Sequence, residues 1–170
     1  KKLENKTAIV TGAASGMGKA IASLFAQEGA NVVLADLKQE EVDVVIKEIT
    51  AKGGKAIGVV CNISNEADIQ KMILHTVATF NTIDVLVNNA GVMDDFVPVH
   101  ELTNELWNRV MAVNINGPFY TCRLAIPYML KQGSGSIVNI ASVGGLYGAR
   151  AGAAYTASKH AVVGLTKNIG

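Results

Sequence analysis

Five short apolar runs recur along the chain, and none of them shows a regular alternation of apolar and polar positions. They are Ala8–Val10, Val32–Leu34, Ala56–Val60, Val85–Val87 and Ile137–Ile140. Runs of this kind are typical of strands that are covered on both faces, as in a parallel sheet. The pattern therefore predicts five parallel strands.

Apolar residues at helical spacing lie between these runs, so each connection can be a crossover helix with one face on the sheet. Ser64 is a plausible N-cap for the second such helix. The helical positions are Val42, Val45, Ile46 and Ile49 in the first segment, and Ile69, Met72, Ile73, Val77 and Phe80 in the second. We expect a single doubly wound α/β domain over residues 1–170, with ligands beyond the carboxyl ends of the strands where the winding reverses.

A longer helical pattern runs from Leu102 to Lys131 and is interrupted at Asn114–Pro118. Pro118 has no N–H, so in a helix the carbonyl of Asn114, four residues back, loses its donor. That carbonyl can then hold a water molecule. A plain kink in a packing helix is the alternative.

Composition narrows the classes of function. The 170 residues are 49% hydrophobic, which is enough for one sizeable core, and the net charge is only +1 without a basic run. Nucleic acid is therefore a poor partner. No apolar run approaches the roughly 20 residues that span a bilayer, so we expect a cytoplasmic protein. Cys61 and Cys122 are isolated in apolar surroundings, which indicates reduced, buried thiols, and the scattered histidines argue against a metal site.

A glycine-rich turn, Thr11–Gly18, follows the first run and precedes a helical pattern near Lys19. The free N–H groups and dipole of a helix N-terminus would bind a pyrophosphate there. Gly12 would allow the turn, Gly16 the approach of phosphates, and Gly18 the packing of the helix. The spacing is G-x-x-x-G-x-G, so an ordinary turn stays open. The candidate cofactor residues of this turn are Gly12, Ser15, Gly16, Met17 and Gly18.

Asp36 closes the second run, 18 positions after Gly18. A carboxylate near this offset can accept hydrogen bonds from the ribose hydroxyls of a dinucleotide. Leu37 is apolar, and Lys38 is the only basic residue nearby, so the sequence shows no obvious binding site for a 2′-phosphate. NAD is therefore favoured over NADP. A solvated loop acid is the alternative.

Asn88-Asn89-Ala90-Gly91 follows the fourth run. Paired amides can tie neighbouring strand ends together, and the small residues Ala90 and Gly91 leave room for a cofactor. A turn alone would also explain this sequence.

Ser142 closes the fifth run, and Tyr155 and Lys159 follow at positions i and i+4 of a helical segment. A phenol, with a pKa of about 10, is a poor acid or base at neutral pH, and a neighbouring ammonium favours its charged form. Ser142 would donate a hydrogen bond to a substrate oxygen. An ordinary tyrosine and lysine on an exposed helix would give the same spacing.

Together these motifs resemble the short-chain dehydrogenases/reductases in their shorter single-domain form. The resemblance implies a catalytic tetrad of Asn114, Ser142, Tyr155 and Lys159, a nicotinamide cofactor that Tyr155 and Lys159 also contact, and reversible hydride transfer between a small-molecule alcohol and a ketone. The matching motifs are T-G-x-x-x-G-x-G from Thr11, Asp36, N-N-A-G from Asn88, Asn114, Ser142, and Y-x-x-x-K from Tyr155.

The chain departs from the family pattern after the third run and at its end. Family members often have an aspartate that holds the adenine amino group, and here Asn62 and Ile63 stand in that place. Members also continue beyond the position of Gly170 with further strands and a substrate lid. We therefore expect a chain that is incomplete at its C-terminus, with an apolar sheet edge to cover, and a homotetramer or dimer as the intact molecule.

The walls of a substrate pocket would come from residues 92–99 and 143–154, with Asp94, Asp95 and Arg150 as their charges. Two other functions remain open. A sugar-nucleotide epimerase would share Y-x-x-x-K, although its glycine turn is normally spaced G-x-x-G-x-x-G. A non-catalytic protein that senses NAD could carry the same motifs.

Overall fold

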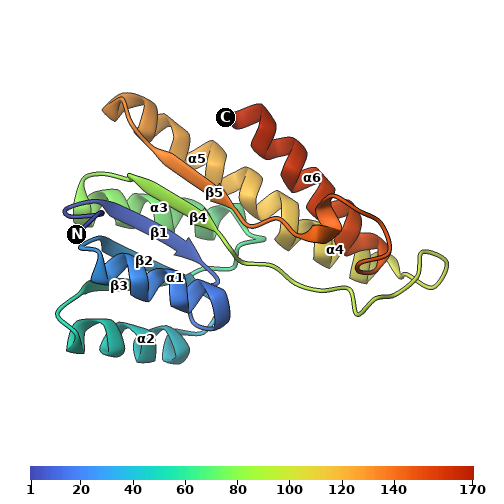
Figure 1. Ribbon diagram of the computed structural model, residues 1–170, viewed down its shortest axis with the longest axis horizontal. Coiled ribbons are helices and arrows are strands. Elements are labelled where there is room, and N and C mark those ends of the chain that lie inside the picture. The colour runs from blue at the N-terminus through green and yellow to red at the C-terminus, as the bar shows by residue number, and fades with distance from the viewer.

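The five apolar runs form the five parallel strands of one sheet in the computed structural model, which describes all 170 residues (Figure 1). The strands are β1 (Thr7–Thr11), β2 (Asn31–Asp36), β3 (Lys55–Val60), β4 (Val85–Asn88) and β5 (Ser136–Asn139). Their order is β3-β2-β1-β4-β5. The chain thus winds outward from β1 in one direction and then, from β4, in the other, so the predicted doubly wound α/β fold is confirmed.

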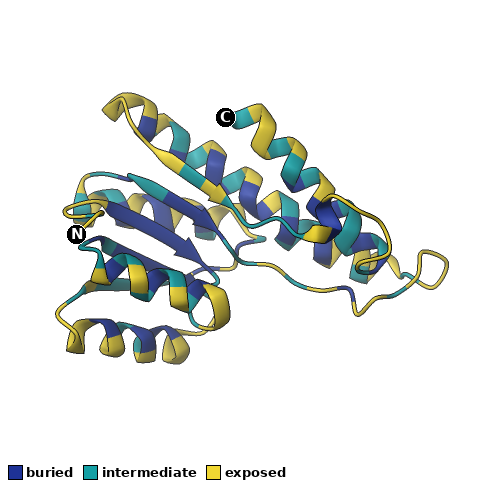
Figure 2. Ribbon diagram, viewed as in Figure 1, coloured by how far each residue is buried: buried dark blue, intermediate teal, exposed yellow.

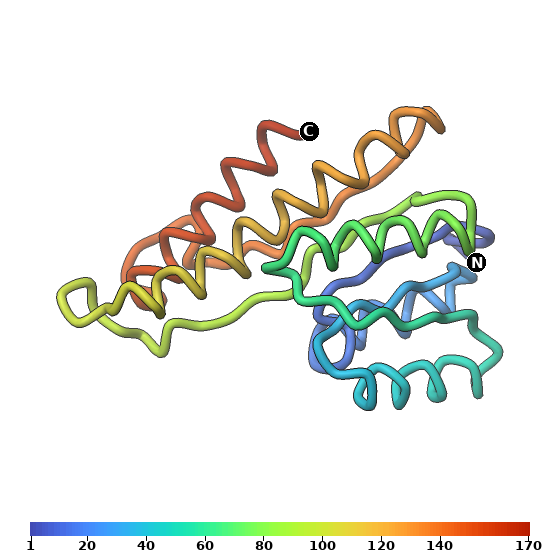
Figure 3. Tube along the Cα trace, turned by 180° about the vertical axis from the view of Figure 1, so that it is seen from behind, coloured from blue at the N-terminus to red at the C-terminus, as the bar shows by residue number.

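Helices cover both faces of this sheet. α1 (Gly16–Gln27) and α2 (Gln39–Ala51) lie on one face, as Figure 1 shows, and α3 (Glu66–Phe80) and α5 (Gly117–Gln132) lie on the other. The remaining helices are α4 (Asn104–Met111) and α6 (Ala153–Ile169), and α6 runs beside α5 in both the front and rear views (Figure 3). No helix has the length and hydropathy that a membrane span requires.

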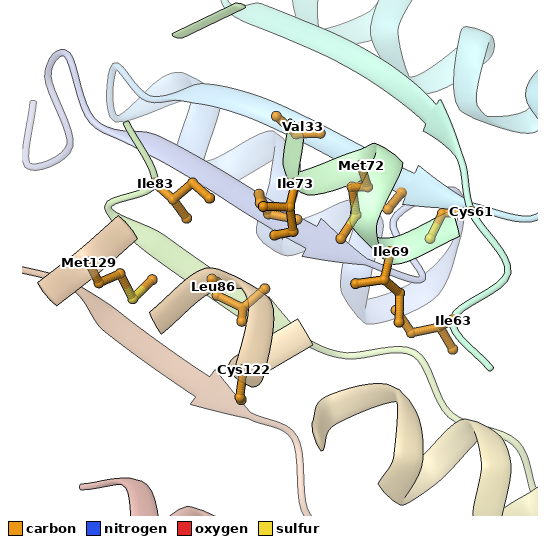
Figure 4. Packing of buried hydrophobic residues seen from close by; sticks show 13 residues of the cluster. Val33, Cys61, Ile63, Ile69, Met72, Ile73, Ile83, Leu86, Cys122 and Met129 are labelled. Atoms are coloured by element: carbon orange, nitrogen blue, oxygen red, sulfur yellow. The ribbon is translucent and has the colours of Figure 1, made fainter. Parts of the chain in front are cut away.

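The alternation of side chains along β1 divides the core in two. Ala8 and Val10 face α1 and α2, whereas Ile9 faces α3 and α5. Ile9 pairs with Val33 of β2 and Leu86 of β4 in register, and these three pack with residues of α3 (Figure 4). Each fully buried side chain of this size contributes about 1.5–3 kcal/mol. The carboxyl ends of β1 and β4 are thereby held on a rigid base.

The two edge strands differ from the prediction of strands covered on both faces. β1, β2 and β4 are largely buried, but Val138 of β5 is 42% exposed and Val60 of β3 is 49% exposed. Each edge strand pairs with one neighbour only, and Figure 2 shows β5 open on the side where α1 and α2 cover the other strands. An apolar run does not reveal which strand will be at an edge.

The predicted N-cap of α3 is wrong by one residue. Asn65, rather than Ser64, precedes the helix in an extended conformation, and its Oδ1 accepts the N–H groups of Ala67 (2.9 Å) and Asp68 (3.4 Å). Asparagine is at least as good a cap as serine. Ser64 instead donates its hydroxyl to Asn62 Oδ1 at 2.7 Å.

The predicted interruption of the long helix is confirmed, although it begins two residues earlier than expected. Residues Ala112–Asn116 form a π-helical turn, η1, between α4 and α5. Pro118 follows directly in the first turn of α5, and it donates no N–H to the turn that precedes it. The extra residue in the turn is what rotates Asn114 into the interior, where it is 1% exposed.

Candidate active site

The glycine-rich turn holds the end of β1 against α1 and β4. Gly12 has φ +63°, and a Cβ at Gly18 would lie 2.1 Å from the carbonyl oxygen of Gly12. Side chains are therefore excluded at Gly18, as the sequence predicts. Asn89 Nδ2 donates to the carbonyls of Thr11 (3.0 Å) and Gly12 (3.1 Å), which fixes the turn to the end of β4.

The N-terminus of α1 is free to bind an anion. The N–H groups of Gly16, Met17 and Gly18 have no partner within the chain, and the N-cap residue Ser15 makes no side-chain cap. No acidic residue lies in the first turn, and a Cβ at Gly16 would meet only open space. Unpaired donors, the helix dipole and this room fit a pyrophosphate.

A cavity of about 350 Å³ lies in front of this helix N-terminus, at the carboxyl ends of β1, β2 and β4. Most of the predicted cofactor residues line it, whereas Gly18, Tyr155 and Lys159 do not. Those that line it are Gly12, Ser15, Gly16, Met17, Asp36, Leu37, Asn62, Ile63, Asn89, Ala90 and Gly91. Three lining residues are not predicted from the sequence: Ala35, Cys61 and Val113, the last of which lies in η1. The only signals for them are the neighbouring residues Asp36, Asn62 and Asn114.

Asp36 is held in place at the end of β2. Its Oδ2 accepts the N–H of Ala14 (2.9 Å) and its Oδ1 accepts the N–H of Leu37 (2.7 Å). Each carboxylate oxygen keeps a lone pair for a further donor. The carboxylate is thus oriented before any ligand binds.

Asn62 is less suited to its expected role. Its Oδ1 already accepts both the N–H (3.0 Å) and the hydroxyl (2.7 Å) of Ser64. Both lone pairs of this oxygen are therefore engaged, while Nδ2 makes no bond within the chain. Asn62 offers a donor to a ring nitrogen rather than an acceptor to an adenine amino group.

The paired amides tie strand ends together as predicted. Asn88 Nδ2 donates to Asn139 Oδ1 at 2.8 Å, which links β4 to β5, and Asn89 links β4 to β1. Thr121 of α5 donates its hydroxyl to Asn88 Oδ1 at 2.7 Å. The strand ends that surround the cavity are therefore joined by side-chain hydrogen bonds.

Asn114 joins the segment after β4 to α6. Its Oδ1 accepts the N–H of Val92 (2.8 Å), and its Nδ2 donates to the Val92 carbonyl (3.0 Å) and to Ser158 Oγ (3.1 Å). Ser158 lies in the same turn of α6 as Tyr155 and Lys159. The π turn therefore helps to place the helix that carries both of these residues.

Lys159 is a buried cation beside a phenol. Its side chain is held by a hydrogen bond of 2.7 Å from Nζ to the Ile140 carbonyl, and Nζ lies 5.7 Å from the centre of the Tyr155 ring. The residue is 4% exposed, and burial lowers the pKa of its ammonium below the ordinary value of 10.5. The predicted i and i+4 pair does lie on one face of a helix.

Ser142 faces Tyr155 across Gly144. Ser142 Oγ accepts the Gly144 N–H at 3.1 Å, so its own proton is free to be donated. A Cβ at Gly144 would lie 3.6 Å from both Ser142 Oγ and Tyr155 Cε1. The hydroxyl and the phenol ring thus border the same space.

Gly91 lies between the cavity and two residues of the predicted tetrad. A Cβ there would lie 3.4 Å from Asn114 Oδ1 and 3.7 Å from Lys159 Nζ, and Gly91 itself lines the cavity. Since Ser142 and Tyr155 border one space and Lys159 lies beside the Tyr155 ring, a hydroxyl donor, a phenol and an ammonium are gathered near the Gly91 end of the cavity. Such a set can bind an oxygen atom and exchange a proton with it.

Residues 6–170 match the sequence profile described as short chain dehydrogenase. The chain belongs to the short-chain dehydrogenase family. The resemblance inferred from the motifs is thereby confirmed.

Several dehydrogenases and reductases are similar to the chain over 98% of its length. It is 44% identical to 3beta-hydroxysteroid dehydrogenase 2 of Eggerthella lenta, covering 65% of that protein. It is 43% identical to the 3-oxoacyl-(acyl-carrier-protein) reductase of Thermotoga maritima, covering 67%, and 42% identical to the cyclohexanol dehydrogenase of an Acinetobacter species, covering 66%. The chain thus spans about two thirds of the length of these relatives.

A solved structure shows the same short-chain dehydrogenase fold. The crystal structure of a metagenomic short-chain oxidoreductase in complex with NADP superposes with a TM-score of 0.94 at 38% identity. The match covers 99% of this chain and 76% of that one.

The two cysteines of this short-chain dehydrogenase are free and buried, as predicted. Burial raises the pKa of the Cys61 thiol to about 11, and it also raises the pKa of Cys122. Both are therefore protonated at neutral pH and unsuited to nucleophilic chemistry.

Proposed function

We propose that this short-chain dehydrogenase transfers a hydride reversibly between NAD(H) and a secondary alcohol or ketone. The observation that carries the proposal is the meeting of Ser142, Tyr155 and Lys159 at the Gly91 end of the cavity. Bound NAD(H) would accept or supply the hydride. Its pyrophosphate would lie on the N-terminus of α1 and its adenosine ribose beside Asp36.

The chain's own residues would handle the proton and orient the substrate. Ser142 would donate a hydrogen bond to the substrate oxygen, and Tyr155 would give a proton to that oxygen during reduction or take it during oxidation. The Lys159 ammonium would stabilise the phenolate electrostatically and bind the nicotinamide ribose. Asn114 would act through Val92 and Ser158, to which it is hydrogen-bonded.

The relatives support this class of substrate. A 3beta-hydroxysteroid dehydrogenase and a cyclohexanol dehydrogenase are named for secondary alcohols, and a 3-oxoacyl reductase is named for a ketone. The alternative of an NAD-sensing protein without turnover has no comparable support.

Replacing Tyr155 with phenylalanine tests the reaction. We expect Tyr155→Phe in the intact protein to lose turnover by at least about 100-fold, since general acid–base catalysis contributes that much or more, while NADH affinity changes little. The measurement is NADH formation or consumption with a panel of secondary alcohols and ketones. Tyr128→Phe is the matched control, because Tyr128 lies in α5, away from the cavity and from the predicted pocket walls, and its hydroxyl makes no hydrogen bond within the chain. Substantial turnover by Tyr155→Phe would assign the proton to another residue.

We also infer a preference for NAD over NADP. The oriented Asp36 carboxylate would accept a ribose hydroxyl and repel a 2′-phosphate. The metagenomic relative binds NADP, so the preference is a property to be measured in this protein. Fluorescence titration should show tighter binding of NADH than NADPH, with Asp36→Ala reducing the ratio. Tighter NADPH binding by the unaltered protein would contradict the inference.

At the level of the molecule, we propose one dinucleotide-binding and catalytic domain over residues 1–170 that assembles into a homotetramer or dimer in the cytoplasm. Trp107 of α4 and Phe119 of α5 support assembly, because both large apolar side chains are more than a third exposed. Light scattering with size-exclusion chromatography measures the assembly.

A further inference from the structure

Asp94 has a position that differs from the one expected from the sequence. It is a predicted charge on the wall of the substrate pocket, but the structure buries it completely, with 0% exposure. Its Oδ2 accepts the N–H of Tyr155 (2.8 Å), and its Oδ1 accepts the N–H groups of Gly152 (3.1 Å) and Phe96 (3.3 Å). A carboxylate from the segment after β4 is therefore bonded to the start of α6.

This carboxylate supplies the cap that α6 lacks. The N-cap residue of α6 is Gly152, which has no side chain with which to cap the helix, and Tyr155 occupies the third helical position. An N-cap side chain normally accepts the N–H of that position, and a capping box also satisfies the N–H of the N-cap residue. Asp94 does both from another element, and its negative charge lies at the positive end of the helix dipole.

Gly152 is needed for space and not for backbone conformation. Its φ of −71° and ψ of 178° are ordinary for any residue. A Cβ there would lie 2.5 Å from Asp94 Oδ2. The glycine therefore admits the carboxylate to the helix N-terminus.

The segment around Asp94 is fixed between two parts of the candidate active site. Val92 is bonded through both backbone groups to Asn114, and Asp94 is bonded to the backbone of Tyr155. Asp95 and Phe96 then adopt φ values of 52° and 59°, which are unfavourable for residues other than glycine. The chain tolerates this strained turn where it directs Asp94 inward.

We propose that Asp94 is a positioning residue that fixes the Tyr155 phenol by capping α6 from outside the helix. The inference rests on the proposed function, because the phenol is positioned for the proton transfer described above. The third helical position, whose N–H a cap normally accepts, is Tyr155 itself. The shortest of the three bonds to Asp94 is the one that the Tyr155 N–H donates, so the cap acts directly on the backbone that carries the phenol.

Five variants of the intact protein, one of them a control, test this role. Asp94→Ala should lower kcat by about 10- to 100-fold, since small misplacements of a catalytic group have effects of this size, while the Kd for NADH stays within about twofold. The kcat of Asp94→Asn should lie between that of Asp94→Ala and that of the unaltered protein, because the asparagine amide has one oxygen acceptor. Glu105→Gln is the matched control, because Glu105 is an exposed acid in the first turn of another helix, α4, outside the walls of the predicted substrate pocket; its kcat should be unchanged.

The decisive variant returns the cap to the helix. In Asp94→Ala/Gly152→Ser, the serine hydroxyl can accept the Tyr155 N–H in the usual way, so most of the lost kcat should return. Gly152→Ser alone should lower kcat, because its Cβ would collide with the Asp94 carboxylate. A double variant that regains thermal stability without kcat would overturn the positioning role, as would an unchanged kcat in Asp94→Ala.

Failure of the proposed function can be told apart from failure of this inference. If the unaltered protein binds NADH but shows no turnover, the proposed function fails. Hydrogen exchange of the Tyr155 amide then decides the cap: faster exchange in Asp94→Ala and slower exchange in the double variant support it. Equal exchange in all three proteins would refute it.

Discussion

Lys159 illustrates a conflict between stability and function at a single residue. Its ammonium is buried with one hydrogen bond, to the Ile140 carbonyl, and no carboxylate partner. Burying an unpaired charge is unfavourable, and the lowered pKa of Lys159 expresses that cost. The proposed reaction gives a reason for keeping the charge, since it lies beside the Tyr155 ring.

Replacing Lys159 with methionine should change how stability depends on pH. The folded state binds this proton less tightly than the unfolded chain, so the buried ammonium destabilises the folded state below its folded pKa. The cost diminishes as the pH rises through that pKa and is gone above 10.5, where the amine is neutral in both states. The quantity to follow is the difference between two free energies of unfolding, that of Lys159→Met minus that of the unaltered protein. This difference should decrease from neutral pH toward pH 10.5.

Urea unfolding at several pH values measures this difference. Lys167→Met is the control for the loss of an exposed lysine, because Lys167 lies on the same helix. A flat or rising difference for Lys159→Met would show that the ammonium is not destabilised by burial.

Residues whose role follows from local spacing are the ones that the sequence predicts well. Tyr155 and Lys159 are one helical turn apart. Gly12 follows β1, Gly18 lies in the first turn of α1 and Asp36 ends β2, so the meeting of these three follows from the fold class. Asp94 could not be assigned in this way. Its partner Tyr155 is 61 positions away, and no periodicity connects the two.

At the scale of elements, the π turn η1 performs a task that a regular helix could not. The extra residue rotates Asn114 inward, where its side chain bonds both backbone groups of Val92. The sequence predicts an interruption because Pro118 lacks an N–H. It does not predict the π turn itself, because that depends on Val92 and Ser158, which lie in distant segments.

Asn114→Ala should destabilise the protein by about 1–3 kcal/mol, because it leaves the N–H and carbonyl of Val92 unpaired in a partly buried place. Urea unfolding measures the loss, and hydrogen exchange at the Val92 amide should become faster. Asn116→Ala is the control within the same turn, since Asn116 is exposed and should change stability by less than about 0.5 kcal/mol. Equal losses for both variants would mean that the turn, and not its bonds to Val92, determines stability.

The exposure of β3 and β5 marks another limit of local prediction. Both strands have the apolar runs of buried strands, yet only the three inner strands are largely buried. Edge position depends on the order of the strands in space, and that order is set by the connections as a whole. The Val138 face of β5 therefore remains open in these 170 residues.

At the scale of the molecule, the cavity lies where two halves of the sheet meet. β1, α1 and β2 contribute the glycine turn and Asp36, whereas β4 contributes Asn89 and Gly91. The order of the strands reverses between β1 and β4, which leaves their carboxyl ends without a crossing connection. A ligand in this crevice contacts both halves at once.

If NADH binds across this junction as proposed, it should stabilise the whole fold. A ligand at about 100 times its Kd adds about 2.7 kcal/mol to the free energy of unfolding. For chains of 150–250 residues each kcal/mol raises Tm by about 2–4 °C, so we expect a rise of about 5–10 °C. Scanning fluorimetry with increasing NADH measures this rise in Tm.

Two variants serve as comparisons. Tyr155→Phe should keep the rise in Tm, because Tyr155 does not line the cavity, and Asp36→Ala should show a smaller rise at the same NADH concentration. A Tm that is insensitive to NADH in the unaltered protein would contradict the assignment of the crevice as the cofactor site, whatever activity the protein displays.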